Sequence, residues 1–178
     1  ASLPLVLEAI PDAWVRRVVV VDNGSDDRTA EVARNGGATL VREPRRGYGS
    51  ACLAGLAKLA EAPPAIVTFL DADFSDHPEE LPRVVAPILA DDADLVIGSR
   101  AIGPRQQGAL LPQARFGNLL ACTLVELFYD YRFTDLGPFR AIRWDALEAL
   151  QMGDPDFGWT VEMQVKAARQ RLRAVEVP

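Results

Sequence analysis

Two aspartates spaced by one residue follow an apolar segment, and their chemistry can be argued first. Asp71 and Asp73 come directly after the run Val67–Leu70. If the extended conformation continues, side chains at i and i+2 share a face of the strand. Two carboxylates that point the same way repel each other and favour a cation. Their hard oxygen ligands suit Mg²⁺ or Mn²⁺, which usually also bind substrate phosphates. Aspartate equally favours turns and helix caps, so the rest of the chain must decide.

Other polar residues also follow predicted strands. Asp22 ends the β-branched run that starts at Arg17, and it could contact a ligand or cap the next helix. Arg100 follows the predicted strand 93–98, and its forked guanidinium suits a phosphate, although an exposed arginine is the alternative. Arg45 and Arg46 lie in a glycine-containing loop. They could attract a diphosphate or simply be solvated.

Composition narrows the classes of protein. The chain has 178 residues, 49% of them hydrophobic, which predicts one domain with a sizeable core. The net charge of −6 does not favour nucleic-acid binding. Cys52 and Cys122 lack metal-ligand spacing, so we expect buried thiols in a reducing, cytoplasmic compartment. There is no signal peptide and no apolar run long enough to predict a transmembrane helix within this chain.

The element pattern predicts an α/β fold. Strands alternate with helices over the first hundred residues, which is typical of a mostly parallel sheet covered on both faces. Residues 1–10 read as a helix already under way, so we expect a strand that is missing from the sequence before it. The loop 103–112 is a candidate mobile lid. The apolar stripe of the helix 115–129 is expected to pack in the core rather than on a membrane. A strand interrupted by Gly137 and Pro138 is expected over residues 134–143.

An ordered set of motifs points to a family. The set comprises Asp22–Thr29, Arg46–Ala51, Leu70–Asp73 with His77–Glu79, Gly98–Arg100, Asp135–Arg140, and Glu162 ahead of Val175–Pro178. Together they resemble family 2 glycosyltransferases, most closely the dolichyl-phosphate mannose synthase-like and polyprenyl-phosphate glycosyltransferase group. The resemblance implies the GT-A (nucleotide-diphospho-sugar transferase) fold, with a mostly parallel central sheet flanked by helices. It also implies a single domain, 1–178, with a nucleotide-sugar half, 1–100, and an acceptor half, 101–178.

The same resemblance implies a donor and a metal. The donor is a UDP- or GDP-linked sugar, and the cofactor is Mn²⁺ or Mg²⁺. By position, Asp22 matches the acid that contacts the base or ribose, and Asp73 the direct metal ligand. Asp71 matches the contact to ribose or donor sugar, and it shares the metal site. Arg100 matches the arginine that reaches the donor phosphates, and Arg46 is a further candidate for the diphosphate. Asn23 stands where many relatives carry aspartate, which changes how the base is held.

The acceptor side is less defined. A hydroxyl acceptor needs a general base, and Asp135 is the candidate. A polyprenyl phosphate is already anionic and needs no base. In that case Asp135 would orient its loop, and Arg115 and Arg140 would hold the acceptor phosphate. Trp159 and Glu162 are expected to line the acceptor site. The resemblance favours inversion at the transferred carbon, and peripheral contact with the cytoplasmic membrane face stays open.

Other functions compete with this interpretation. A haloacid dehalogenase-type phosphatase also has Asp-X-Asp after a strand, but there the motif follows the first strand, and its later lysine is hard to place here. A non-catalytic nucleotide-sugar-binding module is another alternative. A dinucleotide dehydrogenase is weaker, because no G-x-G-x-x-G follows a strand. His77, the only histidine, is expected to have a structural role before Pro78 rather than a catalytic one.

Overall fold

The chain folds into two compact units. The computed structural model describes residues 2–102 and 112–178, leaving out the side chains of 112–116. The first unit comprises Ala1–Ala65, Leu70–Pro82 and Met152–Trp159, and the remaining residues form the second. This division differs from the predicted halves, because two strands from the first hundred residues pair with strands from the end of the chain. The assignment of residues 1–100 to the nucleotide sugar and of residues 101–178 to the acceptor stays a prediction.

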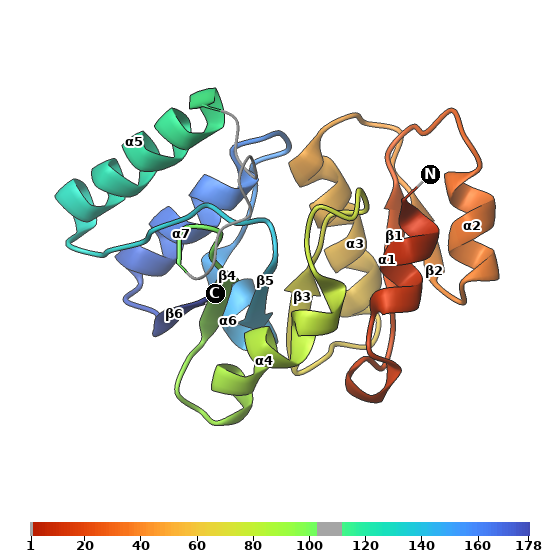
Figure 1. The fold of residues 1–178 in the computed structure, drawn as a ribbon, viewed down its shortest axis with the longest axis horizontal. Coiled ribbons are helices and arrows are strands. Elements are labelled where there is room, and N and C mark those ends of the chain that lie inside the picture. Colours follow the sequence, from red (N-terminus) through yellow and green to blue (C-terminus); the bar gives the residue numbers. More distant parts are fainter. Residues whose placement is uncertain (1, 103–111) are drawn as a thin grey trace. The chain divides into compact units, whose positions relative to one another are not determined.

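The first unit is built on a parallel pair of strands (Figure 1). Its elements are α1 (Leu3–Ala9), η1 (Asp12–Trp14), β1 (Val19–Asp22), α2 (Thr29–Asn35), β2 (Thr39–Arg42), α3 (Tyr48–Ala60) and η2 (Pro78–Glu80). Val20 and Leu40 pack into a cluster with Leu3 of α1 and Ala33 of α2. Val21, on the opposite face of β1, lies against Gly55 of α3. Both faces of the pair are therefore covered, which explains the unbroken β-branched run of β1.

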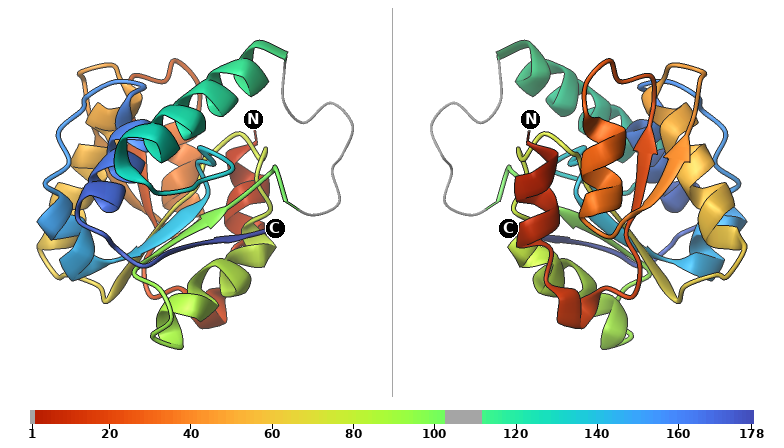
Figure 2. Two further views of the ribbon diagram at one scale, coloured as in Figure 1. Left: turned by 90° about the vertical axis from the view of Figure 1, so that its left-hand side faces the viewer. Right: turned by 90° about the vertical axis from the view of Figure 1, so that its right-hand side faces the viewer.

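The second unit contains a four-stranded mixed sheet in the order β3-β5-β4-β6. Its elements are β3 (Ile66–Phe69), α4 (Leu81–Leu89, entering from the first unit), β4 (Leu95–Gly98), α5 (Pro112–Tyr129), β5 (Arg140–Arg143), α6 (Trp144–Leu150), α7 (Trp159–Arg169) and β6 (Ala174–Val177). Strands β3, β4 and β6 run in one direction, and β5 runs antiparallel between β3 and β4. Figure 2 shows α4 on one face of this sheet and α5 with α7 on the other. The predicted α/β architecture is confirmed.

Two expectations in the second unit are wrong. The strand predicted over 134–143 begins only at Arg140, because side chains from elsewhere bind the backbone of 134–136. The stripe of α5 does not pack in the core. Only Cys122 and Val125 of its described residues are buried, whereas five apolar side chains are exposed: Leu119, Leu120, Leu124, Leu127 and Phe128. The predicted lid lies mainly in 103–111, outside the described residues.

Asn23 holds the loop between β2 and α3 in the first unit. Its Nδ2 donates to the carbonyl oxygens of Glu43, at 2.9 Å, and of Arg45, at 2.6 Å. Its Oδ1 accepts the N–H of Gly47 at 2.9 Å. One amide thus fixes three backbone groups of an irregular loop, which only a side chain with both donors and an acceptor can do.

The segment 152–158 closes the N-terminus of α3 within the same unit. The N–H groups of Gly49 and Ser50 donate to the carbonyl oxygens of Asp156, at 3.0 Å, and Pro155, at 2.7 Å. A Cβ on Gly49 would overlap the carbonyl of Asp154, so the close approach requires glycine. These amides are the groups that a helix N-terminus offers to a phosphate. Here the protein itself occupies them.

An ion-pair cluster ties the starts of β4 and β6 to the end of β5 in the second unit. Asp94 accepts from Arg173 through both carboxylate oxygens, at 2.6 and 3.1 Å, and lies 3.4 Å from Arg143. Arg143 also contacts Asp91 at 2.6 Å. The hydrogen bonds from Arg173 hold the pKa of Asp94 below its usual range.

We expect Asp94→Asn to lower the free energy of unfolding by about 1 kcal/mol at neutral pH. Because the folded-state pKa is lowered, the stabilisation is fully present above about pH 4. It is lost as the pH falls through the lower folded-state value. Urea denaturation between pH 7 and pH 2.5 checks this, with Asp92→Asn, at an exposed neighbouring carboxylate, as the control. A deficit that stays constant down to the lowest pH would contradict the ion-pair explanation.

We expect Asn23→Asp to destabilise the first unit by about 1–3 kcal/mol, because a carboxylate would face two carbonyl oxygens without a proton to donate. Amide hydrogen exchange at Gly47 should accelerate together with a lower unfolding temperature. Asn35→Asp, at an exposed position at the end of α2, adds the same charge and should have a smaller effect. Unchanged protection of Gly47 in Asn23→Asp would show that the hydrogen bonds of Asn23 do not hold this loop.

Candidate functional site

The Asp-X-Asp motif forms a turn rather than a continued strand. Strand β3 ends at Phe69, so Asp71 and Asp73 do not lie on one face of a strand as the spacing predicts. Asp71 is half-buried and Asp73 is exposed. Phe74 adopts a left-handed backbone conformation with φ 64°, and Ser2 Oγ donates to the carbonyl oxygen of Ala72 at 2.9 Å. A hydrogen bond from Ser2, just before α1, thus contacts the backbone of this turn.

Asp73 has the charge that a metal site requires. Hydrogen bonds from the Ser75 side chain and backbone lower the pKa of Asp73 below its usual value, so the carboxylate is ionised at neutral pH. Within the described ranges, no cluster of three or more histidine, cysteine or acidic side chains could hold a metal ion. Two carboxylates without a third protein ligand fit Mg²⁺ or Mn²⁺, which keep positions for water and substrate phosphates. The donor set thus fits the predicted cofactor.

Asp22 and Arg46 lie in neighbouring loops of the first unit. Asp22 Oδ1 accepts the N–H of Ser25 at 2.9 Å, which closes the turn after β1. Asp22 does not cap α2, whose N-cap residue makes no side-chain hydrogen bond. Asp27 instead accepts the N–H of Thr29, the first residue of α2. The exposed side chain of Arg46 reaches Gly24 in this turn. A cationic group thus lies beside the loop that Asp22 organises, as a diphosphate site would need.

Asn23 lies beside these residues but has another task. Both of its amide N–H groups and its carbonyl oxygen bind the backbone of the loop 43–47. These contacts favour a role in shaping the loop over the predicted contact with the base.

Arg100 and Asp135 form a bidentate ion pair in the second unit. Asp135 Oδ2 accepts from both the backbone N–H and Nε of Arg100, and Oδ1 accepts from Nη2, each at 2.8 Å. The side chain of Asp135 is fully buried, whereas 36% of the Arg100 side chain is exposed. Both oxygens of this fully buried carboxylate already accept N–H groups of Arg100. The pair therefore favours the orienting role of Asp135 over the general-base role.

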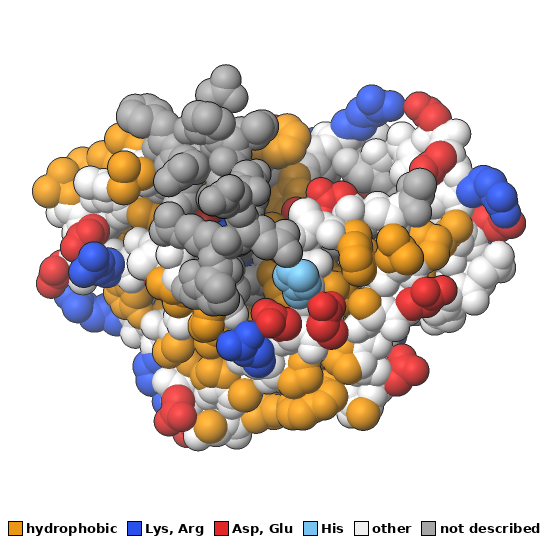
Figure 3. Space-filling model, viewed as in Figure 1, with side chains coloured by type: hydrophobic (Ala, Val, Ile, Leu, Met, Phe, Trp, Pro, Cys, Tyr) orange, Lys and Arg blue, Asp and Glu red, His pale blue; other side chains and the backbone are white. Residues whose placement is uncertain are grey.

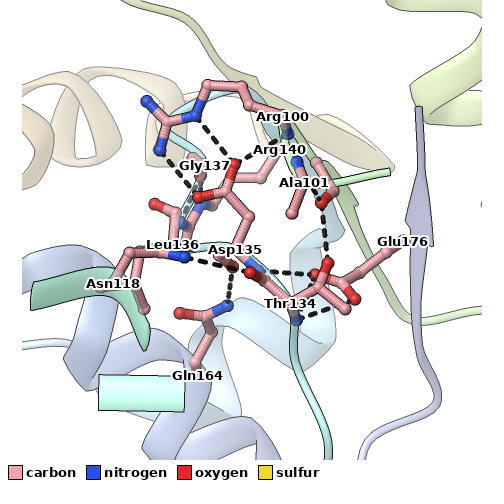
Figure 4. A network of polar contacts seen from close by, with 11 residues as sticks. Arg100, Ala101, Asn118, Thr134, Asp135, Leu136, Gly137, Arg140, Gln164 and Glu176 are labelled. Atoms are coloured by element: carbon pink, nitrogen blue, oxygen red, sulfur yellow. Dashed lines mark hydrogen bonds and ion pairs between the residues drawn. The ribbon is translucent and has the colours of Figure 1, made fainter. Parts of the chain in front are cut away.

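A polar network surrounds this pair (Figure 4). Glu176 of β6 accepts the N–H groups of Thr134 and Asp135, and Gln164 of α7 donates to the carbonyl of Asp135 at 2.7 Å. Asn118 of α5 binds Thr134 and Leu136. The sequence alone indicated no individual role for Glu176, Gln164 or Asn118. Their signal was available, because each is a polar residue within an apolar stretch of its element.

The remaining predicted site residues have varied surroundings. Arg140 is buried and donates to the carbonyls of Leu136, Gly137 and Thr160, which favours a structural role over holding an acceptor phosphate. Trp159 is 1% exposed, so it belongs to the core rather than to an open acceptor surface. Glu162 pairs with Lys166 at 2.8 Å. The side chain of Arg115 lies outside the described residues.

Among the interactions that the structure describes, the His77 side chain contacts only a residue close to it in the sequence. Its exposed ring lies 3.1 Å from Glu79, at the start of η2. The structural role of His77 before Pro78 stays a prediction.

Comparison with known proteins identifies the family. The sequence model of "Glycosyl transferase family 2" matches residues 12–148. A glycosyltransferase of Mycobacterium tuberculosis described as uncharacterized is 41% identical over 177 residues, which cover 99% of this chain and 77% of that protein. The undecaprenyl-phosphate mannosyltransferase of Micrococcus luteus is 32% identical over 197 residues, covering 99% and 76%.

Solved structures agree with the fold. Glucosyl-3-phosphoglycerate synthase of M. tuberculosis, in complex with phosphoglyceric acid, is 25% identical with a TM-score of 0.75. The match covers 99% of this chain and 64% of that one, so the chain spans about two thirds of the length of this neighbour. The same enzyme is known in complex with Mn²⁺, UDP-glucose and phosphoglyceric acid. With the Asp-X-Asp turn, the α/β architecture and these matches together, the chain belongs to glycosyltransferase family 2 and has the GT-A fold.

Proposed function

We propose that this chain transfers a sugar from a UDP- or GDP-linked donor to a phosphorylated acceptor with the help of Mn²⁺ or Mg²⁺. The observation that carries the proposal is the turn at Asp71 and Asp73, whose second carboxylate is ionised and exposed. Membership of the family and the metal and UDP-glucose bound to the structural neighbour support it. A metal bound here would neutralise the charge that develops on the leaving diphosphate.

The donor would be held mainly by the first unit. Asp73 and Asp71 would bind the metal, with Asp71 also near the ribose or donor sugar. Asp22 would contact the ribose or base from the turn after β1, and Arg46 would add positive charge for the diphosphate. In an inverting transfer, an acceptor oxygen forms the new bond to the anomeric carbon. The bond from that carbon to the diphosphate breaks, and the nucleoside diphosphate leaves with the electron pair.

The favoured acceptor is a polyprenyl phosphate. A phosphate oxygen is already a nucleophile and needs no general base, which agrees with the occupied carboxylate of Asp135. One relative at 32% identity is an undecaprenyl-phosphate mannosyltransferase, and the structural neighbour binds phosphoglyceric acid. Both acceptors carry a phosphate. A hydroxyl acceptor that bears a phosphate is therefore the second candidate.

The exposed apolar face of α5, defined by Leu120, Leu124, Leu127 and Phe128, fits a lipid-linked acceptor. Leu127 and Phe128 are 73% and 71% exposed. Figure 3 shows hydrophobic side chains gathered over this region. No described helix is both long and apolar enough to cross a membrane. We infer that this face contacts the cytoplasmic side of the membrane peripherally.

Thermal unfolding with UDP, GDP, CDP and dTDP, each with and without Mn²⁺ or Mg²⁺, tests the donor site. We expect one nucleotide to raise stability only when the metal is present, by about 2.7 kcal/mol at a hundred times its dissociation constant. Asp73→Ala should abolish this shift, whereas Asp92→Ala, at an exposed carboxylate of the second unit, should preserve it. Binding without sugar transfer to any acceptor would favour the non-catalytic module. Phosphomonoester hydrolysis that depends on Asp71, without nucleotide binding, would support the phosphatase instead.

Sedimentation with phosphatidylethanolamine/phosphatidylglycerol vesicles tests the membrane contact. Replacing Leu127 and Phe128 together by serine removes two exposed apolar side chains. We expect vesicle binding to weaken by roughly tenfold or more, because apolar burial drives it. Leu89→Ser, at an exposed leucine of α4, is the matched control and should bind as the wild type does. Equal binding by both variants would contradict the proposed surface.

A further inference from the structure

The loop Thr134–Leu136 has every backbone polar group bound by a side chain from another part of the second unit. Glu176 accepts the N–H groups of Thr134 and Asp135, at 2.9 and 3.1 Å. Asn118 accepts the N–H of Leu136 at 2.7 Å and donates to the carbonyl of Thr134 at 3.0 Å. The carbonyls of Asp135 and Leu136 accept from Gln164 and Arg140. This loop uses no regular secondary structure, so four side chains determine its conformation.

These hydrogen bonds fix the position of Asp135, the central residue of the loop. The carboxylate of Asp135 is fully buried, and Figure 4 shows that carboxylate bound by Arg100. A buried carboxylate destabilises the fold unless it is paired with good geometry. The bidentate contact therefore restricts the guanidinium of Arg100 to one orientation, while part of that side chain remains exposed. A flexible arginine would lose rotamer freedom on binding an anion, and this one has lost it already.

Support also comes from Ser99, which lies between the end of β4 and Arg100. Ser99 Oγ lies 2.8 Å from Thr134 Oγ1, and the N–H of Ser99 donates to Val177 of β6. The chain on both sides of the ion pair is thus joined to β6. Hydrogen bonds therefore connect the residue after β4 both to the loop and to β6.

We propose that Asn118, Gln164 and Glu176 are positioning residues, which act through Asp135 to preorganise Arg100 as a binding point for a substrate phosphate. This inference rests on the proposed function. The shared chemistry is a phosphate oxygen anion, which comes either from the donor diphosphate or from the acceptor phosphate. Asp135 has no proton-transfer step in this assignment. Its contribution passes entirely through the guanidinium that it orients.

A double-mutant cycle separates positioning from base catalysis. The variants are Asp135→Asn, Arg100→Ala and the combination, measured for kcat and for the KM of donor and acceptor. We expect Asp135→Asn to raise one KM by roughly tenfold, within the range of a lost charge-assisted contact. It should have no further effect in the Arg100→Ala background. A pH-dependent loss of kcat that persists in that background would identify Asp135 as a base and overturn the proposal.

A second double-mutant cycle, with Asn118→Ala and Arg100→Ala, tests whether Asn118 acts through Arg100. The binding of two probes is measured by calorimetry. A nucleoside diphosphate with Mn²⁺ reports the donor, and farnesyl phosphate in detergent reports the acceptor. We expect one probe to bind several-fold more weakly to Asn118→Ala, and no additional loss in the double variant. Equal losses in both backgrounds would show a general structural effect and overturn the positioning role. If Asn118→Ala does not fold, Gln164→Ala takes its place in the cycle, because it removes the donor to the carbonyl of Asp135 without adding a charge.

A ligand-free measurement distinguishes failure of this inference from failure of the proposed function. The Arg100 Nε–H signal in ¹H–¹⁵N spectra should exchange slowly in the wild type, and rapidly in Asp135→Asn and Asn118→Ala. An unchanged signal in both variants would overturn the positioning role even if the wild type binds a nucleotide. If the wild type binds neither probe, the proposed function and the phosphate role of Arg100 both fail, whatever the signal shows.

Discussion

The buried carboxylate of Asp135 imposes the strongest constraint on the second unit. A charge removed from water must be paired, and Arg100 meets this requirement with three N–H groups. The geometry of that pair then depends on the loop that carries Asp135, which has no strand or helix to fix it. Side chains from β6, α5 and α7 supply the missing hydrogen bonds. In the role proposed for Arg100, polar residues from three elements position its partly exposed side chain.

The first unit uses the same principle on a smaller scale. The loop between β2 and α3 is irregular, and the amide of Asn23 satisfies three of its backbone groups. The carbonyls of 155 and 156 satisfy the N-terminus of α3 in turn. Polar side chains that look like ligand contacts from their position after a strand can therefore be occupied by the protein itself. Asn23 is of this kind, and Arg140, at the start of β5, is likewise occupied by backbone carbonyls, whereas Asp73 and Arg46 keep exposed charged groups.

This distinction shapes the proposed chemistry. The proposed metal ligands are only Asp71 and Asp73, and Asp73 is ionised and exposed, which would suit a cation that also binds the donor's diphosphate. In the second unit, Arg100 is held by Asp135, and both oxygens of that carboxylate are occupied. Under the proposed function, this suits an acceptor that brings its own negative charge. An apolar helix face, unexplained by packing among the described residues, agrees with an acceptor attached to lipid.

The sequence by itself determined the α/β class, nearly all helices and strands, and the family. These depend on local periodicity and on motifs that can be read directly along the sequence, such as the β-branched run of β1 and the Asp-X-Asp pair. It also placed Asp22 at the end of β1 and Arg100 just after β4, whereas the extended conformation expected at Asp71 and Asp73 is a turn in the structure. Only the tertiary structure decided the antiparallel placement of β5, the late start of that strand, the exposed face of α5 and the occupation of Asn23, Asp135 and Arg140. The physical reason is that each of these outcomes depends on hydrogen bonds and burial between residues far apart in the chain, as between Asp135 and Glu176. Spacing along the sequence carries no information about such partners.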